Sequence, residues 1–308
     1  MKFNLNWKHL GLAAGLSFTL VAAGCGSDDE ASGDQSDSSG DVNYSEEMDY
    51  TITGIEAGAG VVAAAEDAVE TYDSLSGWEV ATSSSGAMAT ELGEAVKDEE
   101  PIVVTGWTPH WKFAKYDLKY LEDPEGSFGG EEQIKTMVRK GLEEDKPNAY
   151  KLLDQFKWEA ADMETVMLDI NEGSSEQEAA QAWIEDNQDK VSEWTDGVED
   201  VDGVEVELVY VNWDSEIAST NVVAEVMKQK GFDVEITPLE NGGMWEAVAQ
   251  GEVAGMVAAW LPATHEAQLS KHEGEVVDLG ANLEGAKIGL VVPKYMEVDS
   301  IEDLQPAE

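Results

Sequence analysis

Three tryptophans stand where predicted strands end, and together their side chains could bind a cation. Trp107 lies in "GWTPHW" (residues 106–111) after the apolar run "PIVV", Trp260 lies in "AWLPATH" (259–265), and Trp213 lies in "VNWD". Aromatic faces carry negative electrostatic potential, so several rings around one point suit a quaternary ammonium group, at about 0.5–2 kcal/mol for each desolvated ring. A tryptophan after a strand is also a common packing residue, and only the recurrence of the pattern favours binding.

A possible binding site for a carboxylate accompanies these rings. In "GIEAGAGVV" (54–62) a glycine-rich turn runs into a predicted helix, where the backbone N–H groups of Gly60 and Val61 can bind a carboxylate or phosphate. His265 adds a side-chain donor after the second Trp-x-Pro. The alternatives are a tight strand-to-helix turn and a surface or capping histidine. A site for a cation beside a site for a carboxylate predicts a zwitterionic ligand.

An internal repeat positions these residues. The segment that begins at Gly77 parallels the one that begins at Gly231, and Trp-x-Pro falls at the same place in both. Each copy predicts a strand, a polar turn, a short amphipathic helix and a buried strand. The expected elements are 79–82, 88–96 and 102–105 in the first copy, and 233–237, 244–249 and 254–259 in the second. A further strand and helix precede each copy, at 50–72 and 204–230.

Each half therefore reads as β-α-β-α-β, which predicts an α/β fold with parallel sheets in two similar lobes. Ligands of open α/β sheets bind beyond the carboxyl ends of the strands, so we expect the ligand cleft between the lobes. The predicted domains are a first lobe at 50–130, a helical connecting segment packed on a lobe at 131–200, and a second lobe with a C-terminal crossover at 201–308. The crossover consists of a strand, Pro293 and a short helix with Ser300 as its N-cap.

The N-terminus predicts export. Residues 1–24 carry lysines, then an apolar run, then small residues, which is typical of a secretory signal peptide. "LVAAGC" resembles the lipobox of bacterial lipoproteins, which implies acylation of Cys25, the only cysteine. Residues 25–49 are acidic and contain no lysine or arginine, so we expect a flexible linker there.

The formal net charge of −47 repels nucleic acid and simple anions, and it suits a surface exposed to high salt, as in a halophilic or salt-tolerant host. No spacing of histidine, cysteine or carboxylates predicts a metal site, and no cofactor is expected. Asp214, Ser215 and His265 could be drawn as a triad, but no nucleophile-elbow glycines flank Ser215. We therefore expect a binding protein and no enzyme.

Four long motifs make a resemblance specific. They occur in one order across residues 50–304, and they are similar to the glycine-betaine-binding lipoproteins of bacterial compatible-solute ABC transporters: "GWTPHWKFAKYDLKYLEDP", "QFKWEAADME", "VNWDSEIASTNV" and "AWLPATHEAQLSKH". The resemblance implies a two-lobed periplasmic-binding-protein-like fold of type II. It also implies a chain that is circularly permuted relative to other betaine-binding proteins, because the half from Val204 resembles their first half. Ala263 departs from the pattern, since relatives carry a polar residue there, and this leaves fine specificity open.

The resemblance also implies roles for individual residues. Trp107, Trp213 and Trp260 would form a prism around the trimethylammonium group, and the amides of Gly60 and Val61 with the His265 side chain would bind the carboxylate. The expected partners are glycine betaine or a related zwitterion such as proline betaine, an ABC permease with its ATPase, and the membrane through the N-terminal lipid. The alternative is a binding protein or sensor for another quaternary ammonium compound, choline or carnitine.

Overall fold

A computed structural model describes residues 43–307. Their helices are α1 (Tyr44–Glu47), α2 (Gly60–Thr71), α3 (Ser85–Asp98), α4 (Lys112–Lys115), α5 (Leu142–Asp145), α6 (Pro147–Gln155), α7 (Ala160–Asn171), α8 (Glu176–Asp186), α9 (Gln188–Trp194), α10 (Asp214–Gln229), α11 (Asn241–Gln250) and α12 (Glu266–Lys271). The strands are β1 (Thr51–Gly54), β2 (Glu79–Thr82), β3 (Val103–Thr108), β4 (Leu118–Tyr120), β5 (Glu132–Arg139), β6 (Val204–Tyr210), β7 (Phe232–Pro238), β8 (Gly255–Leu261) and β9 (Val276–Pro293). Two short 3-10 helices, η1 (Asp73–Leu75) and η2 (Ile301–Asp303), complete them.

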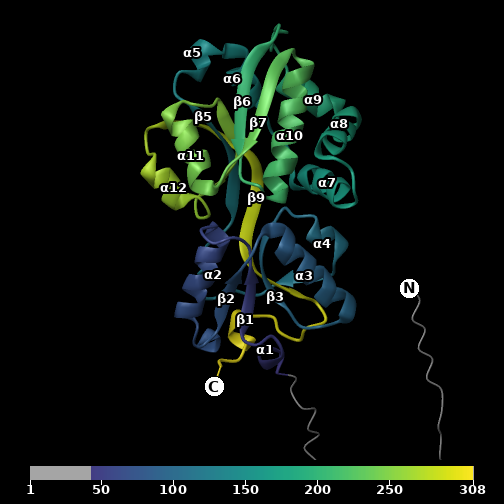
Figure 1. Ribbon diagram of the computed structural model, residues 1–308, viewed down its shortest axis with the longest axis vertical. Helices are drawn as coiled ribbons and strands as arrows, with labels where there is room; N and C mark the ends of the chain where they lie inside the picture. The colour runs from purple at the N-terminus through teal and green to yellow at the C-terminus, as the bar shows by residue number, and fades with distance from the viewer. Residues whose placement is uncertain (1–42, 308) are drawn as a thin grey trace, which may run out of the picture. The chain divides into compact units, whose positions relative to one another are not determined.

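The strands form two groups that share β9 (Figure 1). Strands β2, β1 and β3 are parallel neighbours, as are β7, β6 and β8. We call the first group with α1–α4 lobe 1, and the second group with β5 and α5–α12 lobe 2. The two parallel groups confirm the expected two-lobed α/β fold of type II.

Strand β9 departs from the expected pair of purely parallel sheets. Its first part, from Val276 to Ala286, pairs antiparallel with β5, and its second part, from Lys287 to Val291, pairs antiparallel with β3. The 18-residue strand thus joins the two lobes into one run of paired strands, β2-β1-β3-β9-β5-β8-β6-β7. It gives the lobes a shared backbone connection near the candidate site.

The helices of the repeat begin and end where their residues permit. Ser84 accepts a hydrogen bond from the Ala87 backbone N–H and caps α3, while Gly251 closes α11 in the left-handed conformation. The final 3-10 helix η2 has Ser300 as its N-cap with a capping box, as predicted. The strands and helices expected for both copies are present with small shifts at their ends.

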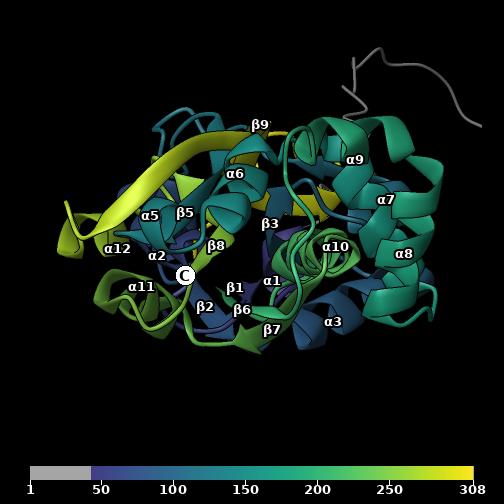
Figure 2. The same ribbon diagram turned by 90° about the horizontal axis from the view of Figure 1, so that it is seen from above.

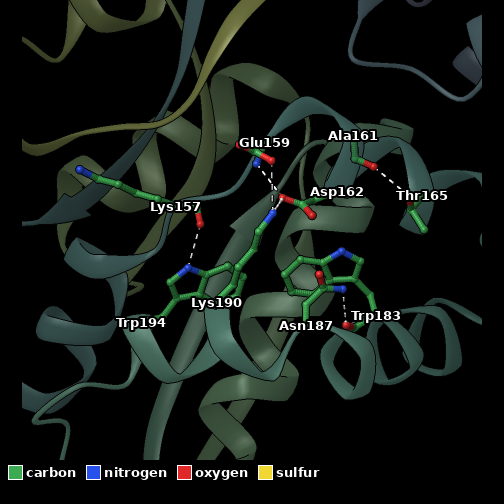
Figure 3. Close-up of polar contacts among 9 residues, drawn as sticks. All are labelled: Lys157, Glu159, Ala161, Asp162, Thr165, Trp183, Asn187, Lys190 and Trp194. Atoms are coloured by element: carbon green, nitrogen blue, oxygen red, sulfur yellow. Dashed lines mark hydrogen bonds and ion pairs between the residues drawn. The ribbon is translucent and has the colours of Figure 1, made fainter.

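The segment 131–200, expected to be helical, begins with strand β5 and continues with helices α5–α9. Figure 2 shows α7 and α8 beside α10, so these two helices pack against the helix that follows β6. In Figure 3 the Trp194 indole N–H donates to the Lys157 carbonyl at 2.8 Å, and Lys190 lies 2.5 Å from Asp162. Trp183 stacks on Trp194 with ring centroids 5.4 Å apart, so both indoles are packing residues of this segment.

The expected linker ends earlier than residue 49. Helix α1 covers Tyr44–Glu47, Ser45 is buried, and its hydroxyl accepts a hydrogen bond from the Gln305 backbone N–H at 2.8 Å. The last linker residues are therefore part of lobe 1, held by the C-terminal segment. The predicted signal peptide, Cys25 and most of the linker lie outside the described residues. Within 43–307, no helix has the length and apolar character needed to cross a bilayer.

Candidate functional site

The three predicted tryptophans line one cavity. Trp107 belongs to β3, Trp260 belongs to β8, and Trp213 is the N-cap residue of α10. The indoles of Trp107 and Trp213 lie 6.5 Å apart between centroids at an angle of 45°. All three rings are at least 95% buried, and the remaining lining is largely apolar: Ile55, Val61, Thr264 and Ile288. The cavity thus receives one ring from lobe 1 and two from lobe 2.

Trp107 and Trp260 occupy equivalent places in the two lobes. Each lies near the end of the third strand of its parallel group, and each is followed two residues later by a proline after a cis peptide bond, Pro109 and Pro262. Trp107 pairs with Ile288 of β9 in the same way as Trp260 pairs with Ile134 of β5. The repeated Trp-x-Pro therefore directs two indoles at one point from opposite lobes.

Carboxylates bind the indole N–H groups of two of the rings. The Trp260 N–H donates to Glu216 at 2.7 Å, and the Trp213 N–H donates to Glu56, which lies in the loop between β1 and α2. A carboxylate acceptor polarises the indole and makes its face more attractive to a cation. Neither acid was identified from the sequence. Glu216 is fully buried, and burial raises its pKa to about 7 in spite of the hydrogen bonds from Ser215 and Trp260.

The amides of Gly60 and Val61 lie at the start of α2, as predicted. Their N–H groups make no hydrogen bond within the part of the chain that the structure describes, because the first turn of a helix has no intrahelical acceptors and Ala59 offers no side-chain cap. Val61 lines the cavity, and Gly60 lies against the backbone of Thr264 in lobe 2. Two free donors with a positive helix end therefore stand beside the indoles.

His265 supplies a third free donor. Its Nδ1 accepts a hydrogen bond from the Trp260 backbone N–H at 3.0 Å, so the neutral ring carries its proton on Nε2. Among residues 43–307 that Nε2 has no partner, although the residue is fully buried. Burial lowers the pKa of His265 to about 3, so the ring is neutral at physiological pH. It stacks on Trp213 with centroids 5.8 Å apart.

Glu132 fixes the loop that carries His265. Its buried carboxylate accepts hydrogen bonds from the Ala263 and Thr264 backbone N–H groups, both at 2.8 Å, and from the Thr264 hydroxyl. Glu132 begins β5, which the sequence did not predict, and its partners lie about 130 residues further along the chain. No local pattern identified this anchor.

Asp214 joins the lobes beside the cavity. Its carboxylate accepts from the Ser85 hydroxyl at 3.2 Å and lies 3.3 Å from Nε2 of His110, both in lobe 1. Burial opposes ionisation of Asp214, but these contacts hold its pKa below the usual value. The Ser215 hydroxyl donates to Glu216 at 2.6 Å. Asp214, Ser215 and His265 are therefore bonded to other residues and do not form the hydrogen bonds of a catalytic triad. Trp111 packs between His110 and Tyr116 and does not line the cavity.

Comparison with known proteins identifies the family. The family model described as the substrate binding domain of ABC-type glycine betaine transport systems matches residues 34–186 and 204–308. The glycine betaine/carnitine transport binding protein GbuC of Listeria monocytogenes is 55% identical over 265 residues, which are 85% of this chain and 88% of GbuC.

Two solved structures are also similar over part of their length. Lactococcal OpuAC, closed and complexed with glycine betaine, is 56% identical, and the match covers 47% of this chain and 57% of that one at a TM-score of 0.46. A choline binding protein of an ABC transporter in complex with choline is 30% identical, with 61% of each chain covered and a TM-score of 0.47. The extent of the family match and the identity to GbuC decide the assignment: this chain belongs to the substrate-binding domains of ABC-type glycine betaine transport systems.

Proposed function

We propose that this protein captures glycine betaine in a cage made by Trp107, Trp213 and Trp260 and delivers it to the permease of an ABC transporter. The observation that carries the proposal is a cavity lined by indoles from both lobes. The faces of the three rings suit a trimethylammonium group, which has no N–H to donate and is bound by cation–π attraction. GbuC, 55% identical, is described as a glycine betaine/carnitine binding protein, which supports this ligand class.

The carboxylate of the ligand would accept from Gly60, Val61 and His265. These donors are free within residues 43–307, and each comes from an element fixed by other contacts. Donors held in advance lower the ordering cost of binding. Closure of the lobes excludes water from the cation and strengthens each contact. The same arrangement accepts proline betaine, which also presents a methylated cation and a carboxylate.

Choline and carnitine are the competing ligands. Choline has the same cation but no carboxylate, so it would leave the donors of Gly60, Val61 and His265 without an acceptor, at a cost of about 1–3 kcal/mol for a buried donor. A 30% identical relative is a choline binding protein in complex with choline, so choline is included as a ligand in the test below. Carnitine has both a trimethylammonium group and a carboxylate, but they are further apart than in glycine betaine.

The location of the protein is part of the proposal. We propose a signal peptide at residues 1–24, acylation of Cys25, and work on the outer face of the cell membrane. We also propose that the order of the two halves is permuted relative to other betaine-binding proteins, which leaves the cleft intact because both halves still meet at β9.

Calorimetric titration of the purified protein with glycine betaine, choline and carnitine tests the proposal. We expect betaine to bind and choline to bind far more weakly. Each change of Trp107, Trp213 or Trp260 to alanine should weaken betaine binding by about two- to thirtyfold, because a desolvated ring is worth about 0.5–2 kcal/mol. Trp183→Phe, in the stacked pair of lobe 2, is the control and should leave affinity unchanged. Preferential binding of choline would overturn the carboxylate assignment, and unaltered binding in all three variants would overturn the cage.

A further inference from the structure

A buried lysine lies against one of the cage rings. Lys112 begins helix α4 and is fully buried, and its Nζ lies 4.3 Å from the centroid of the Trp107 ring. Within residues 43–307 this Nζ has no hydrogen-bond partner. The indole face is thus a stabilising contact of the ammonium, and the Phe113 ring lies further away at 5.7 Å.

The ionisable groups around Lys112 do not neutralise it directly. Asp214 attracts its charge from lobe 2 without bonding to it, and His110, edge-on to Trp107 at 4.6 Å, is neutral because burial lowers its pKa to about 4. Burial lowers the pKa of Lys112 to about 7, and the charge of Asp214 only partly opposes this. Both forms of Lys112 are therefore present near neutral pH.

Trp107 contacts both this lysine and the cavity. The residue lines the cavity, whereas Lys112 does not. An ammonium over this ring uses negative potential that a ligand cation needs, and two like charges beside one buried ring repel with little screening. We propose that Lys112 is a positioning residue that sets the affinity of Trp107 for a quaternary ammonium ligand, and that its protonated form opposes ligand binding. The inference rests on the proposed function, because it requires a cation beside Trp107.

Two consequences distinguish this role from simple packing. First, betaine should bind more tightly when Lys112 loses its proton, by about three- to tenfold, since the carboxylate of the ligand offsets part of the repulsion. Second, binding near pH 7 should release part of a proton from Lys112 Nζ to the solvent. Glu216 also titrates near this pH and is bonded to Trp260, so the pH dependence of the native protein alone does not separate the two groups.

The test is calorimetric titration with glycine betaine at pH 6 and pH 8.5, together with proton release measured at pH 7 in two buffers of different ionisation enthalpy. Lys112→Met keeps the length of the side chain and removes the charge, and Lys112→Gln is a second uncharged variant. Lys97→Met is the control, because Lys97 is an exposed lysine of α3 in the same lobe and its ion pair is with the neighbouring Asp98, away from lobe 2. Thermal unfolding of each variant checks that it is folded.

We expect both Lys112 variants to bind betaine about three- to tenfold more tightly than the native protein at pH 6, and to release fewer protons at pH 7. Lys97→Met should match the native protein in both measurements. Folded Lys112 variants with native affinity and native proton release would overturn the inference and leave the proposed function standing. Absence of betaine binding to the native protein would overturn the proposed function and this inference together.

Discussion

The indole N–H of Trp213 donates a hydrogen bond to the carboxylate of Glu56, and this bond joins the two lobes. Trp213 precedes α10 in lobe 2, whereas Glu56 lies between β1 and α2 in lobe 1. The same indole faces the cavity, so one side chain both lines the candidate site and connects the lobes. Occupation of the site and closure of the lobes are thereby linked at a single residue.

Replacing Glu56 with alanine should therefore shorten the lifetime of the bound state. The variant loses a charge-assisted hydrogen bond that exists only when the lobes meet, and we expect affinity for betaine to fall about tenfold, mainly through faster release. Stopped-flow tryptophan fluorescence measures the release rate. Glu66→Ala, an exposed acid on α2, is the matched control and should release betaine at the native rate. An unchanged rate in Glu56→Ala would mean that this contact does not hold the lobes together.

The sequence was sufficient for the elements that local patterns encode. The two parallel strand groups, the repeated Trp-x-Pro and the cap at Ser300 follow from periodicity and capping residues, and the structure has them. The proximity of Trp107 to Trp213 also follows, because strand ends of parallel sheets gather ligand loops at one edge.

The features of the fold and site that were not predicted depend on contacts between residues far apart in the sequence. Strand β5 was missed because it opens a segment rich in helix formers. A strand before Pro293 was predicted, but its extension back to Val276 and its antiparallel pairing with both lobes were not, because pairing with distant strands leaves no local mark. Lysine is among the residue types most seldom fully buried, so the burial of Lys112 between Trp111 and Phe113 was not predicted. Glu56 and Glu216 were two acids among many, and only the fold places them at the indole N–H groups.

His265 should make the protein less stable in mild acid. The pKa of its buried ring is about 3, well below the usual value near 6.5, so between these values the unfolded chain binds a proton that the folded protein does not. Stability therefore falls as pH drops from about 6.5 towards 3, by about 2 kcal/mol at pH 5 from this residue alone. His110 acts in the same direction, whereas Glu216, whose pKa is raised to about 7, acts in the opposite one.

Because these contributions overlap, the measurement is the difference between the native protein and His265→Gln in urea unfolding at pH 7.5 and pH 5. Glutamine is uncharged at both values, so the native protein should lose about 2 kcal/mol more than the variant between them. Equal losses would show that His265 is protonated, or accessible to water, in the folded protein.

Glu132→Gln should destabilise the loop that carries His265. The native carboxylate accepts three hydrogen bonds from Ala263 and Thr264, whereas an amide has only one oxygen to accept them and brings an NH₂ group against other donors. We expect a loss of about 2 kcal/mol in unfolding free energy and weaker betaine binding. Urea unfolding and calorimetry measure both. Glu131→Gln, the exposed neighbour, should behave like the native protein, and a stable Glu132→Gln with native affinity would remove the anchoring role.

Gly60→Ala should prevent full closure while leaving the lobes folded. Gly60 opens α2 with helical geometry that alanine also adopts, but a Cβ there would meet the carbonyl oxygen of Thr264 in lobe 2 and lie 2.7 Å from its Cα. Both contacted atoms belong to the Thr264 backbone and cannot move away as a flexible side chain would. The lobes must therefore separate, which moves Val61 away from the indoles. Betaine affinity should fall by more than about tenfold with little change in the urea midpoint. Gly86→Ala, also in the first turn of a helix but facing open space, is the matched control and should bind normally. Native affinity in Gly60→Ala would mean that betaine is bound without this contact between the lobes.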